Sequence, residues 1–340
     1  GIDSSLVCAI AKKELGYPVQ SFTVRFAERE YNEADVAYRI ANHLDLDHQE
    51  FEFEKFHAEE IEKITAFFGQ PFGDHSAIPT YHVAKLAAQH VKVVLTGDGG
   101  DEGFAGYQTS MALQYAQRFG GIFGNPFVQT AANRLPVIKS NKYVRGLTRL
   151  HANQGGKYVV DINGKKGFRH LTDSWRSTDP TALIKAIDAP EVSDWQALSG
   201  DWVRRGQYVD LRNLLPNDFL VKVDVMTMAS GLEARSPLLD KDLMELAFRI
   251  PSEQKLKGRT TKYLLRKLVS KYVPEDISNL PKKGFSLPVD TWIRTNLLYV
   301  EEQLKQARSF IDRYVNFMHV EGMLNQHREG KKWGRQLWLL

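Results

Sequence analysis

The 340-residue sequence lacks several features that would place it in a specialised class of protein. Its single cysteine, Cys8, excludes an internal disulfide and a cysteine-rich metal site. No run of about 18 apolar residues is present, and the first residues lack the basic and apolar pattern of a secretory signal. We therefore expect a cytoplasmic protein without membrane contact, in which Cys8 is a buried structural thiol.

The sequence also lacks a large excess of positive or negative charge, because its net charge is only +4. No stretch alternates basic and aromatic residues as strand-binding grooves do, so nucleic acid is not an expected partner. Basic residues are denser toward the C-terminus. Such a cluster is suited to binding phosphate groups, although basic residues on the solvated face of a helix are a commoner explanation for it. They are Lys255, Lys257, Arg259, Lys262, Arg266, Lys267, Lys282 and Lys283.

Glycine and carboxylates are concentrated in the stretch Thr96–Glu102, which follows the apolar run Val91–Leu95. This order predicts the C-terminal end of a buried parallel strand, where open α/β sheets bind ligands, followed by a helix over 102–119. Asp98, Asp101 and Glu102 repel one another unless a cation lies among them, and oxygen ligands with glycine-rich backbone suit Mg²⁺ and phosphate. A solvated acidic turn and a Ca²⁺ loop are the alternatives.

Strand and helix patterns alternate before this stretch. Crossovers of this length predict a doubly wound parallel sheet in an α/β fold. The predicted strands are Val19–Arg25, His48–Phe53 and Val91–Leu95, and the predicted helices are Leu6–Leu15, Asn32–Leu44, Phe56–Phe68 and Pro79–His90. Between the last two helices, Gln70–Pro79 reads as a loop too polar for the core, in which Asp74 caps a helix or reaches a ligand.

The second half of the chain is predicted to be mostly helical. Residues 127–205 show no clear pattern of helix or strand, and within them Tyr158–Gly164 is a candidate hairpin. Helix-like apolar spacing follows over Asp210–Leu215, Asp218–Ser230, Asp240–Phe248, Thr260–Tyr272 and Val289–Gln306. A nucleotide-binding α/β part over residues 1–120 thus grades into a mostly helical part over residues 121–340, within one unit.

The first five residues, Gly1–Ser5, stand at the start of a predicted helix. Asp and Ser residues there are ordinary N-caps. The functional alternative is an anion site, where Ser hydroxyls and free N–H groups meet a phosphate at the positive end of the helix.

Five separated stretches together resemble the synthetase domain of glutamine-dependent asparagine synthetases. Gly1–Ser5 resembles the second half of the S-G-G-x-D-S-S loop of N-type ATP pyrophosphatases, and Thr96–Tyr107 resembles the (S/T)-G-(D/E)-G-x-D-E-x-F-x-G-Y motif. Phe219–Asp240 resembles the K-x-D-x-x-x-M-A…E-x-R-x-P-x-L-D block. The K-x-x-L-R and P-K-x-G-F elements match Thr261–Arg266 and Pro281–Phe285. The resemblance implies an adenine nucleotide alpha-hydrolase-like (PP-loop) fold.

This resemblance implies an ATP- and Mg²⁺-dependent, AMP-forming ligase. The side-chain carboxylate of aspartate attacks the α-phosphorus of ATP, and ammonia then displaces AMP to form asparagine. The resemblance implies that Gly1, Ser4 and Ser5 bind pyrophosphate and that Lys262 is the catalytic cation. Asp3 and Asp101 are the implied Mg²⁺ ligands.

Other positions carry implied roles near the same site. Thr96 and Gly97 correspond to residues that contact ATP, and Val24 to one that lines adenine, where simple core packing is the compatible alternative. Asp98 occupies the acidic position that handles the acyl adenylate, with a shorter side chain than the glutamate of many members. The remaining residues, Glu102, Glu233 and Arg235, are implied to contact substrate or to support the site. For Glu233 and Arg235, the supporting role would be that of a buried ion pair.

Full members of this family carry an N-terminal glutaminase domain with a terminal cysteine nucleophile. This sequence begins with Gly1 inside the pyrophosphate loop, and we expect ammonia-dependent synthesis from it at best, with the glutaminase domain as a partner in the full-length protein. A homodimer is left open. Two alternatives remain: adenylation of another carboxylate, as in β-lactam synthetases or amidotransferase-like relatives, and a nucleotide-binding domain without turnover.

Overall fold

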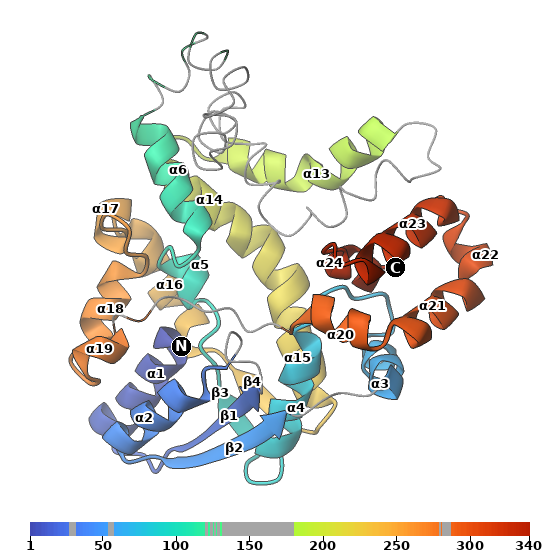
Figure 1. The fold of residues 1–340 in the computed structure, drawn as a ribbon. Helices are drawn as coiled ribbons and strands as arrows, with labels where there is room; N and C mark the ends of the chain where they lie inside the picture. The colour runs from blue at the N-terminus through green and yellow to red at the C-terminus, as the bar shows by residue number, and fades with distance from the viewer. Residues whose placement is uncertain are drawn as a thin grey trace.

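Helices and short parallel strands make up the described part of the chain (Figure 1). The structure is a computed structural model that describes residues 1–26, 32–53, 58–119, 122, 125, 127, 130, 180–278, 280 and 287–340. Two features of the sequence lie outside these residues, the candidate hairpin Tyr158–Gly164 and the Pro281–Phe285 motif.

The N-terminal part alternates helix and strand, as predicted. Its elements are α1 (Ile2–Ala9), the π-helical turn η1 (Ile10–Glu14), β1 (Gln20–Phe26), α2 (Ala34–Leu44), β2 (Asp47–Phe53), α3 (Ala58–Phe68), α4 (Ala77–Ala87) and β3 (Val93–Leu95). The hydrophobic periodicities of the sequence therefore specify these elements correctly.

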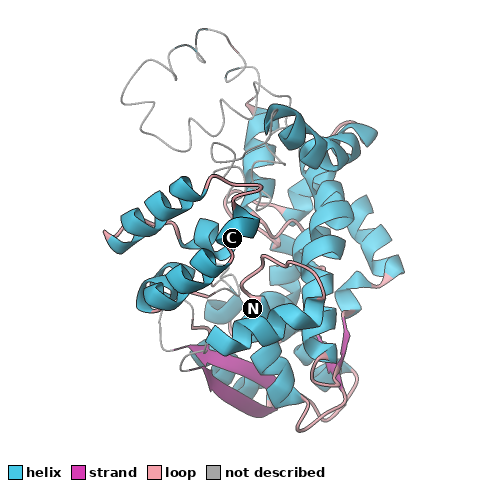
Figure 2. Cartoon of the chain, turned by 90° about the vertical axis from the view of Figure 1, so that its right-hand side faces the viewer, coloured by secondary structure: helices cyan, strands magenta, loops and turns pink. Residues whose placement is uncertain are grey.

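The strands form two separate parallel pairs. β1 pairs with β2 along their whole length, and β3 pairs with β4 (Glu233–Arg235), a strand that the sequence did not predict. Figure 2 shows the strands gathered at one end of the molecule, with helices filling the rest. The described residues are thus mixed α/β, mostly helical with small parallel sheets, and a single doubly wound sheet stays a prediction.

The prediction that β3 is a buried strand is wrong, because none of its three residues is buried and Val94 is only partly covered. Val93 and Leu95 are 51% and 52% exposed. The two side chains point to the same side because residues alternate along a strand. Within the described part of the chain, β3 pairs only with β4. The apolar composition of β3 therefore indicates that it forms a strand, but not that the strand is buried.

The part of the chain from α5 onward is mostly helical in its described residues, as predicted for residues 121–340, but some helix bounds differ. Its elements are α5 (Gly100–Gly103), α6 (Gln108–Arg118), α13 (Pro180–Ala197), α14 (Trp202–Val209), the π-helix η3 (Asp210–Phe219), α15 (Leu220–Met228), the 3₁₀ turn η4 (Pro237–Leu239), α16 (Lys241–Arg249), α17 (Ser252–Lys255), α18 (Tyr263–Val269), α19 (Glu275–Ser278), α20 (Val289–Thr295), α21 (Leu297–Gln306), α22 (Arg308–Ile311), α23 (Phe317–Arg328) and α24 (Gly334–Trp338).

Two local predictions are corrected. The helix expected over 102–119 breaks between α5 and α6, where Ala105 has a left-handed backbone with φ of 55°. The end of the loop expected over Gln70–Pro79 instead forms the first turn of α4, and Ile78 and Pro79 are buried. A proline fits the first turn of a helix because its missing N–H would have no partner there.

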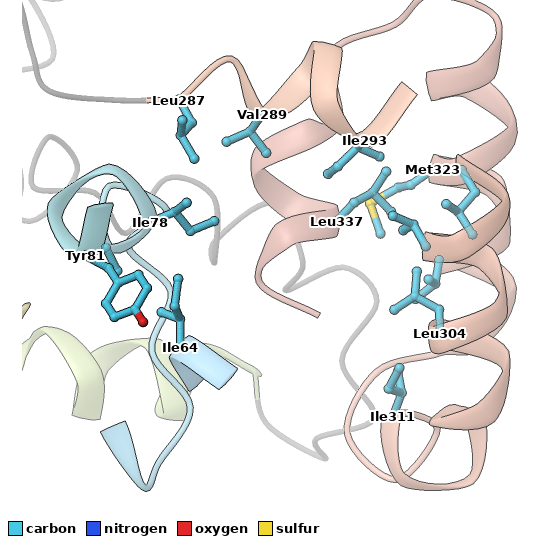
Figure 3. Packing of buried hydrophobic residues seen from close by; sticks show 14 of the residues in the cluster. Ile64, Ile78, Tyr81, Leu287, Val289, Ile293, Leu304, Ile311, Met323 and Leu337 are labelled. Carbon is cyan, nitrogen blue, oxygen red and sulfur yellow. The ribbon is translucent and has the colours of Figure 1, made fainter. Parts of the chain in front are cut away.

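The largest hydrophobic cluster joins the sheet end of the molecule to the C-terminal helices. Figure 3 shows Ile293, Met323 and Leu337 directed toward one another between α20, α23 and α24. A second hydrophobic cluster contains Leu6 of α1 and Leu265 of α18, two helices that are in contact. This second contact brings two segments that are distant in the sequence side by side and sets the distance between their polar ends.

We expect the N-cap of α23 to contribute to the stability of the fold and not to activity. The Asn316 side-chain oxygen accepts from the backbone N–H of Met318 at 3.1 Å. Asn316→Ala should lower the free energy of unfolding by about 1 kcal/mol in urea titrations and leave turnover unchanged. Asn42→Ala, an exposed position inside α2, is the matched control and should not destabilise the fold. Equal losses in both variants would contradict the capping role.

Membrane spans are absent from the described residues, where none of the helices is both long and apolar enough to cross a bilayer.

Candidate active site

Lys262 lies between two carboxylates that are far from it in the sequence. Its ammonium is 2.5 Å from Asp3 Oδ2 and 2.6 Å from Asp101 Oδ1. Only 5% of the Lys262 residue surface is exposed. The structure therefore brings the Gly1–Ser5 stretch, the Thr96–Glu102 stretch and Lys262 into one cluster, which the sequence predicted.

Each member of this cluster is placed by the end of a helix. Asp3 is in the first turn of α1, and Asp101 is in α5, whose N-cap Gly99 has φ of 91°. Lys262 is the N-cap of α18 and has a left-handed backbone, with φ of 52°. Left-handed backbone in a residue other than glycine is uncommon and concentrates at functional sites.

Two carboxylates share the Lys262 ammonium, and the Arg266 guanidinium also attracts Asp3. Burial lowers the pKa of Lys262, but the attraction of Asp3 and Asp101 outweighs it and leaves that pKa above its ordinary value. Lys262 therefore stays charged at neutral pH.

Three glycines allow the backbone to approach these side chains. A Cβ on Gly97 would lie 2.8 Å from both the Asp3 Cβ and the Ser4 backbone nitrogen, and one on Gly100 would lie 2.5 Å from Asp3 Oδ1. A Cβ on Gly106 would overlap Asp101 Oδ1 and the Lys262 Cε atom. The glycine-rich composition of this stretch is thus required by close packing around the ion pair.

The donor set fits Mg²⁺. The Oδ1 atom of Asp3 is buried and has no hydrogen-bond partner, which leaves an oxygen ligand for a cation. A search of the described residues finds no group of three metal-binding side chains, but Mg²⁺ usually keeps several waters and takes one or two carboxylates plus substrate phosphates. Mg²⁺ ligation by Asp3 and Asp101 stays a prediction that this geometry accommodates.

Asp98 and Thr96 form a short polar chain with Ser236. The Thr96 hydroxyl donates to Asp98 Oδ2 at 2.7 Å and lies 2.7 Å from the Ser236 hydroxyl. Burial raises the pKa of Asp98, although the Thr96 hydrogen bond and the charge of Lys222 oppose the shift. Ser236 was not predicted as a site residue, although its position between Arg235 and Pro237 in the Phe219–Asp240 block was a signal for it.

Glu102 is a supporting residue, enclosed by hydrogen bonds. It is 2% exposed, and its side chain accepts from the Tyr107 hydroxyl at 2.5 Å. Burial raises the pKa of Glu102, whereas the Tyr107 hydrogen bond opposes that shift. The Gln207 amide donates to the Glu102 backbone carbonyl, and Lys255 donates to the Gln207 side chain at 3.1 Å. This chain fixes α5 against α14 and α17.

The prediction of a buried ion pair between Glu233 and Arg235 is wrong. The two side chains do pair, but they are 49% and 69% exposed. They lie two residues apart on β4, a short strand that leaves this face open. Arg235 reaches the site through its backbone instead, because its carbonyl accepts from the Thr96 N–H at 2.8 Å.

The remaining predicted residues occupy defined places, and their roles stay predictions. Ser4 is exposed next to Gly97, whereas the buried Ser5 donates its hydroxyl to the Gly1 carbonyl at 2.8 Å. Val24 is buried in the largest hydrophobic cluster, as its core alternative predicts. Burial raises the pKa of the Cys8 thiol, which fits an unreactive residue.

A second polar cluster surrounds Lys222 of α15. The Lys222 ammonium donates to Asp74 Oδ2 and the Ser76 hydroxyl, both at 2.7 Å, and lies over the Phe219 ring at 4.8 Å. Burial alone would raise the pKa of Asp74, but attraction to Lys222 outweighs it and lowers that pKa. Burial and repulsion from Asp74 raise the pKa of Asp218 to about 7.

Asp74 was predicted either to cap a helix or to contact a ligand. Asp74 does cap, since it accepts from the Ser76 N–H at 2.9 Å before α4 begins. Its pairing with Lys222, 148 residues away, was missed. The only signal for it was the Lys222 position in the Phe219–Asp240 block.

Comparison with known proteins identifies relatives of the whole chain. A family model described as asparagine synthase matches residues 1–340. A glutamine-hydrolysing asparagine synthetase 1 of Bacillus subtilis is 32% identical over 96% of this chain and 51% of its own length. A Mycobacterium bovis protein, provisionally named as the same kind of enzyme, is 31% identical over all of this chain and 52% of its own length.

A more distant relative bears a different name. The amidase chyE of Penicillium rubens is 27% identical over 81% of this chain and 44% of its own length. This chain thus spans about half the length of the relatives that it matches.

Proposed function

Because the chain belongs to the asparagine synthase family, we propose that it activates the side-chain carboxylate of aspartate with ATP and transfers the acyl group to ammonia. The family implies ATP use and an adenylating domain. The observation that carries the proposal is the Lys262 cluster, in which one buried cation and two carboxylates meet beside the N-terminal end of α1.

In the first step, a carboxylate oxygen of aspartate attacks the α-phosphorus of ATP, and the bond to pyrophosphate breaks. Negative charge gathers on the leaving group, and Lys262 and the Ser4 hydroxyl are its proposed donors. Ser5 would join them only by releasing the Gly1 carbonyl, to which its hydroxyl donates. Asp3 and Asp101 would hold Mg²⁺, which supplies charge neutralisation for the phosphates when it is bound.

In the second step, the nitrogen of ammonia attacks the acyl carbon, AMP leaves, and the nitrogen loses a proton. Asp98 is the proposed base. Its buried carboxylate has a raised pKa, and a carboxylate that binds protons more tightly is a stronger base. Thr96 orients Asp98 through their hydrogen bond. Thr96 and Gly97 also remain proposed ATP contacts, and Val24 a proposed adenine contact.

The full-length protein is proposed to obtain ammonia from a glutaminase domain, because the relatives are named glutamine-hydrolysing and this chain spans about half of them. A cytoplasmic location and an assembly into homodimers stay predictions.

Pyrophosphate release tests the proposal. With ATP, Mg²⁺, ammonium chloride and aspartate, we expect pyrophosphate, AMP and asparagine in equal amounts, and much less pyrophosphate when aspartate is left out. Turnover with another carboxylate in place of aspartate would transfer the assignment to a related adenylating enzyme, an alternative that the amidase relative keeps open. MgATP binding without turnover on any carboxylate would leave a nucleotide-binding domain.

A further inference from the structure

Arg266 of α18 lies one helical turn after Lys262, and no step of the proposed reaction uses it. Its Nε donates to the Thr261 carbonyl at 2.9 Å, and its Nη1 donates to the Ser278 and Leu280 carbonyls at 2.7 and 2.9 Å. One guanidinium thus connects the residue before Lys262 to two main-chain carbonyls at and just beyond the end of α19 (Glu275–Ser278).

The peptide groups on both sides of the Lys262 Cα hydrogen-bond to Arg266. The Thr261 carbonyl accepts from the Arg266 side chain, and the Lys262 carbonyl accepts from the Arg266 backbone N–H at 2.8 Å. The Lys262 backbone between these carbonyls is left-handed, with φ of 52°, a conformation that is costly for a residue with a side chain. The two hydrogen bonds resist rotation of the flanking peptide groups and so stabilise this conformation.

The direction of the Lys262 side chain depends on its backbone conformation. Rotation of this backbone to the common right-handed or extended region would redirect the Cα–Cβ bond. The ammonium would then leave its place between Asp3 and Asp101, which lie 2.5 and 2.6 Å from it. Lys262 is only 5% exposed, so its side chain has little space in which to compensate.

The guanidinium also adds positive charge near Asp3. Burial lowers the pKa of Arg266, and attraction to Asp3 opposes that shift, so the side chain stays charged. A lysine would keep the charge. Its single ammonium, on a flexible stem, cannot hold the Thr261 carbonyl while it bridges the Ser278 and Leu280 carbonyls. Arg266→Lys therefore separates the hydrogen-bond geometry from the charge.

We propose that Arg266 is a positioning residue for Lys262, which holds the left-handed turn before α18 and thereby keeps the Lys262 ammonium between Asp3 and Asp101. Arg266 acts through the main chain and needs no contact with substrate. Its effect on turnover rests on the proposed adenylation, whereas its effect on the placement of Lys262 does not depend on which carboxylate reacts.

The kinetics of Arg266→Lys test the positioning role. We expect kcat for pyrophosphate release to fall about 10- to 100-fold, because displacements near 1 Å at a positioned group have effects of that size. The KM for ATP should stay within about 2-fold, since Lys262 acts on charge that develops in the transition state. Added to Lys262→Met, Arg266→Lys should lower turnover less than about 2-fold further. Arg249→Lys, at an exposed arginine of α16, is the matched control and should resemble wild type.

Acetylation of lysines measures the placement of Lys262 without any substrate. In wild type at mildly alkaline pH, mass spectrometry should find Lys262 acetylated at least about 10-fold more slowly than the exposed Lys271, because burial and a raised pKa both reduce its reactive free amine. Arg266→Lys should bring the Lys262 rate toward that of Lys271. Lys222, a buried lysine that also pairs with a carboxylate, should keep its wild-type rate in this variant.

Equal acceleration of acetylation at Lys262 and Lys222 would show a general loosening of the fold and overturn the positioning role. An unchanged kcat in Arg266→Lys would also overturn it, as would equal losses of turnover in the wild-type and Lys262→Met backgrounds. If neither Arg266→Lys nor Arg266→Gln folded, Arg266 would serve the whole fold and the proposal would be wrong.

Failure of the proposed function gives a different result. If aspartate yields no asparagine but Arg266→Lys selectively accelerates acetylation of Lys262, the positioning role is supported and the aspartate assignment is refuted. If aspartate does yield asparagine and Arg266→Lys changes neither kcat nor the acetylation of Lys262, the positioning role alone is refuted.

Discussion

Lys262→Met is expected to lower kcat/KM for pyrophosphate release by at least about 100-fold, the cost of losing one preorganised donor to a developing charge. The substitution keeps the length of the side chain and removes its ammonium. It also leaves Asp3 and Asp101 close together without the cation between them. Breaking a buried ion pair by removing one partner costs about 3–5 kcal/mol of folding stability, so a lower melting temperature is expected as well.

The response to Mg²⁺ tests whether the two acids form a metal site. If Asp3 and Asp101 bind Mg²⁺, excess Mg²⁺ should raise the melting temperature of Lys262→Met more than that of wild type, because the metal replaces the missing charge. Sodium at equal ionic strength should not do so. Lys271→Ala, at an exposed lysine just after α18, is the control and should resemble wild type in both assays.

The pH dependence of stability follows from the same ion pair. The pKa of Lys262 is raised above the ordinary 10.5, so its contribution to stability is complete below that value and is lost only as the pH rises beyond it. Between neutral pH and pH 10, the stability difference between wild type and Lys262→Met should therefore stay constant. If Lys262→Met turned over at the wild-type rate, the proposed catalytic role of this lysine would be wrong.

Local elements and the first cluster were predictable from the sequence. The helices and strands of the N-terminal part follow from apolar periodicity, which acts over a few residues. The meeting of Asp3, Asp101 and Lys262 was predicted from motif resemblance, and no local pattern indicates it, since Asp3 and Lys262 are 259 residues apart. Contact between α1 and α18, whose Leu6 and Leu265 belong to one hydrophobic cluster, brings Asp3 and Lys262 together.

The errors share one physical cause, which is that burial depends on distant partners. Val93 and Leu95 have the composition of a buried strand, yet exposure is decided by which segments cover β3. Glu233 and Arg235 pair as expected but on an open strand face. The pairing of Asp74 with Lys222 joins a polar loop to a helix, and neither stretch alone contains a signal for the other.

Gly106→Ala is expected to have the second large effect, although it adds a single methyl group. The new Cβ would overlap both Asp101 Oδ1 and Lys262 Cε, so the two side chains of the ion pair must separate to make room. Overpacking of this kind costs about 1–3 kcal/mol of stability. We expect kcat/KM for pyrophosphate release to fall at least about 100-fold, because displacements near 1 Å at a positioned group have effects of that size.

A matched control and a double variant show whether the ion pair is the cause. Gly322→Ala makes the same chemical change inside α23, where an added Cβ meets no atom within 4 Å, and it should stabilise the helix by about 0.5–1 kcal/mol. If Gly106→Ala acts by separating Asp101 from Lys262, adding it to Lys262→Met should reduce turnover little further, since both changes remove the same interaction. If the losses of kcat/KM in the two single variants add fully in the double variant, Gly106→Ala acts on something other than this ion pair. The close approach of the Gly106 backbone would then make room for the nucleotide and not for Lys262.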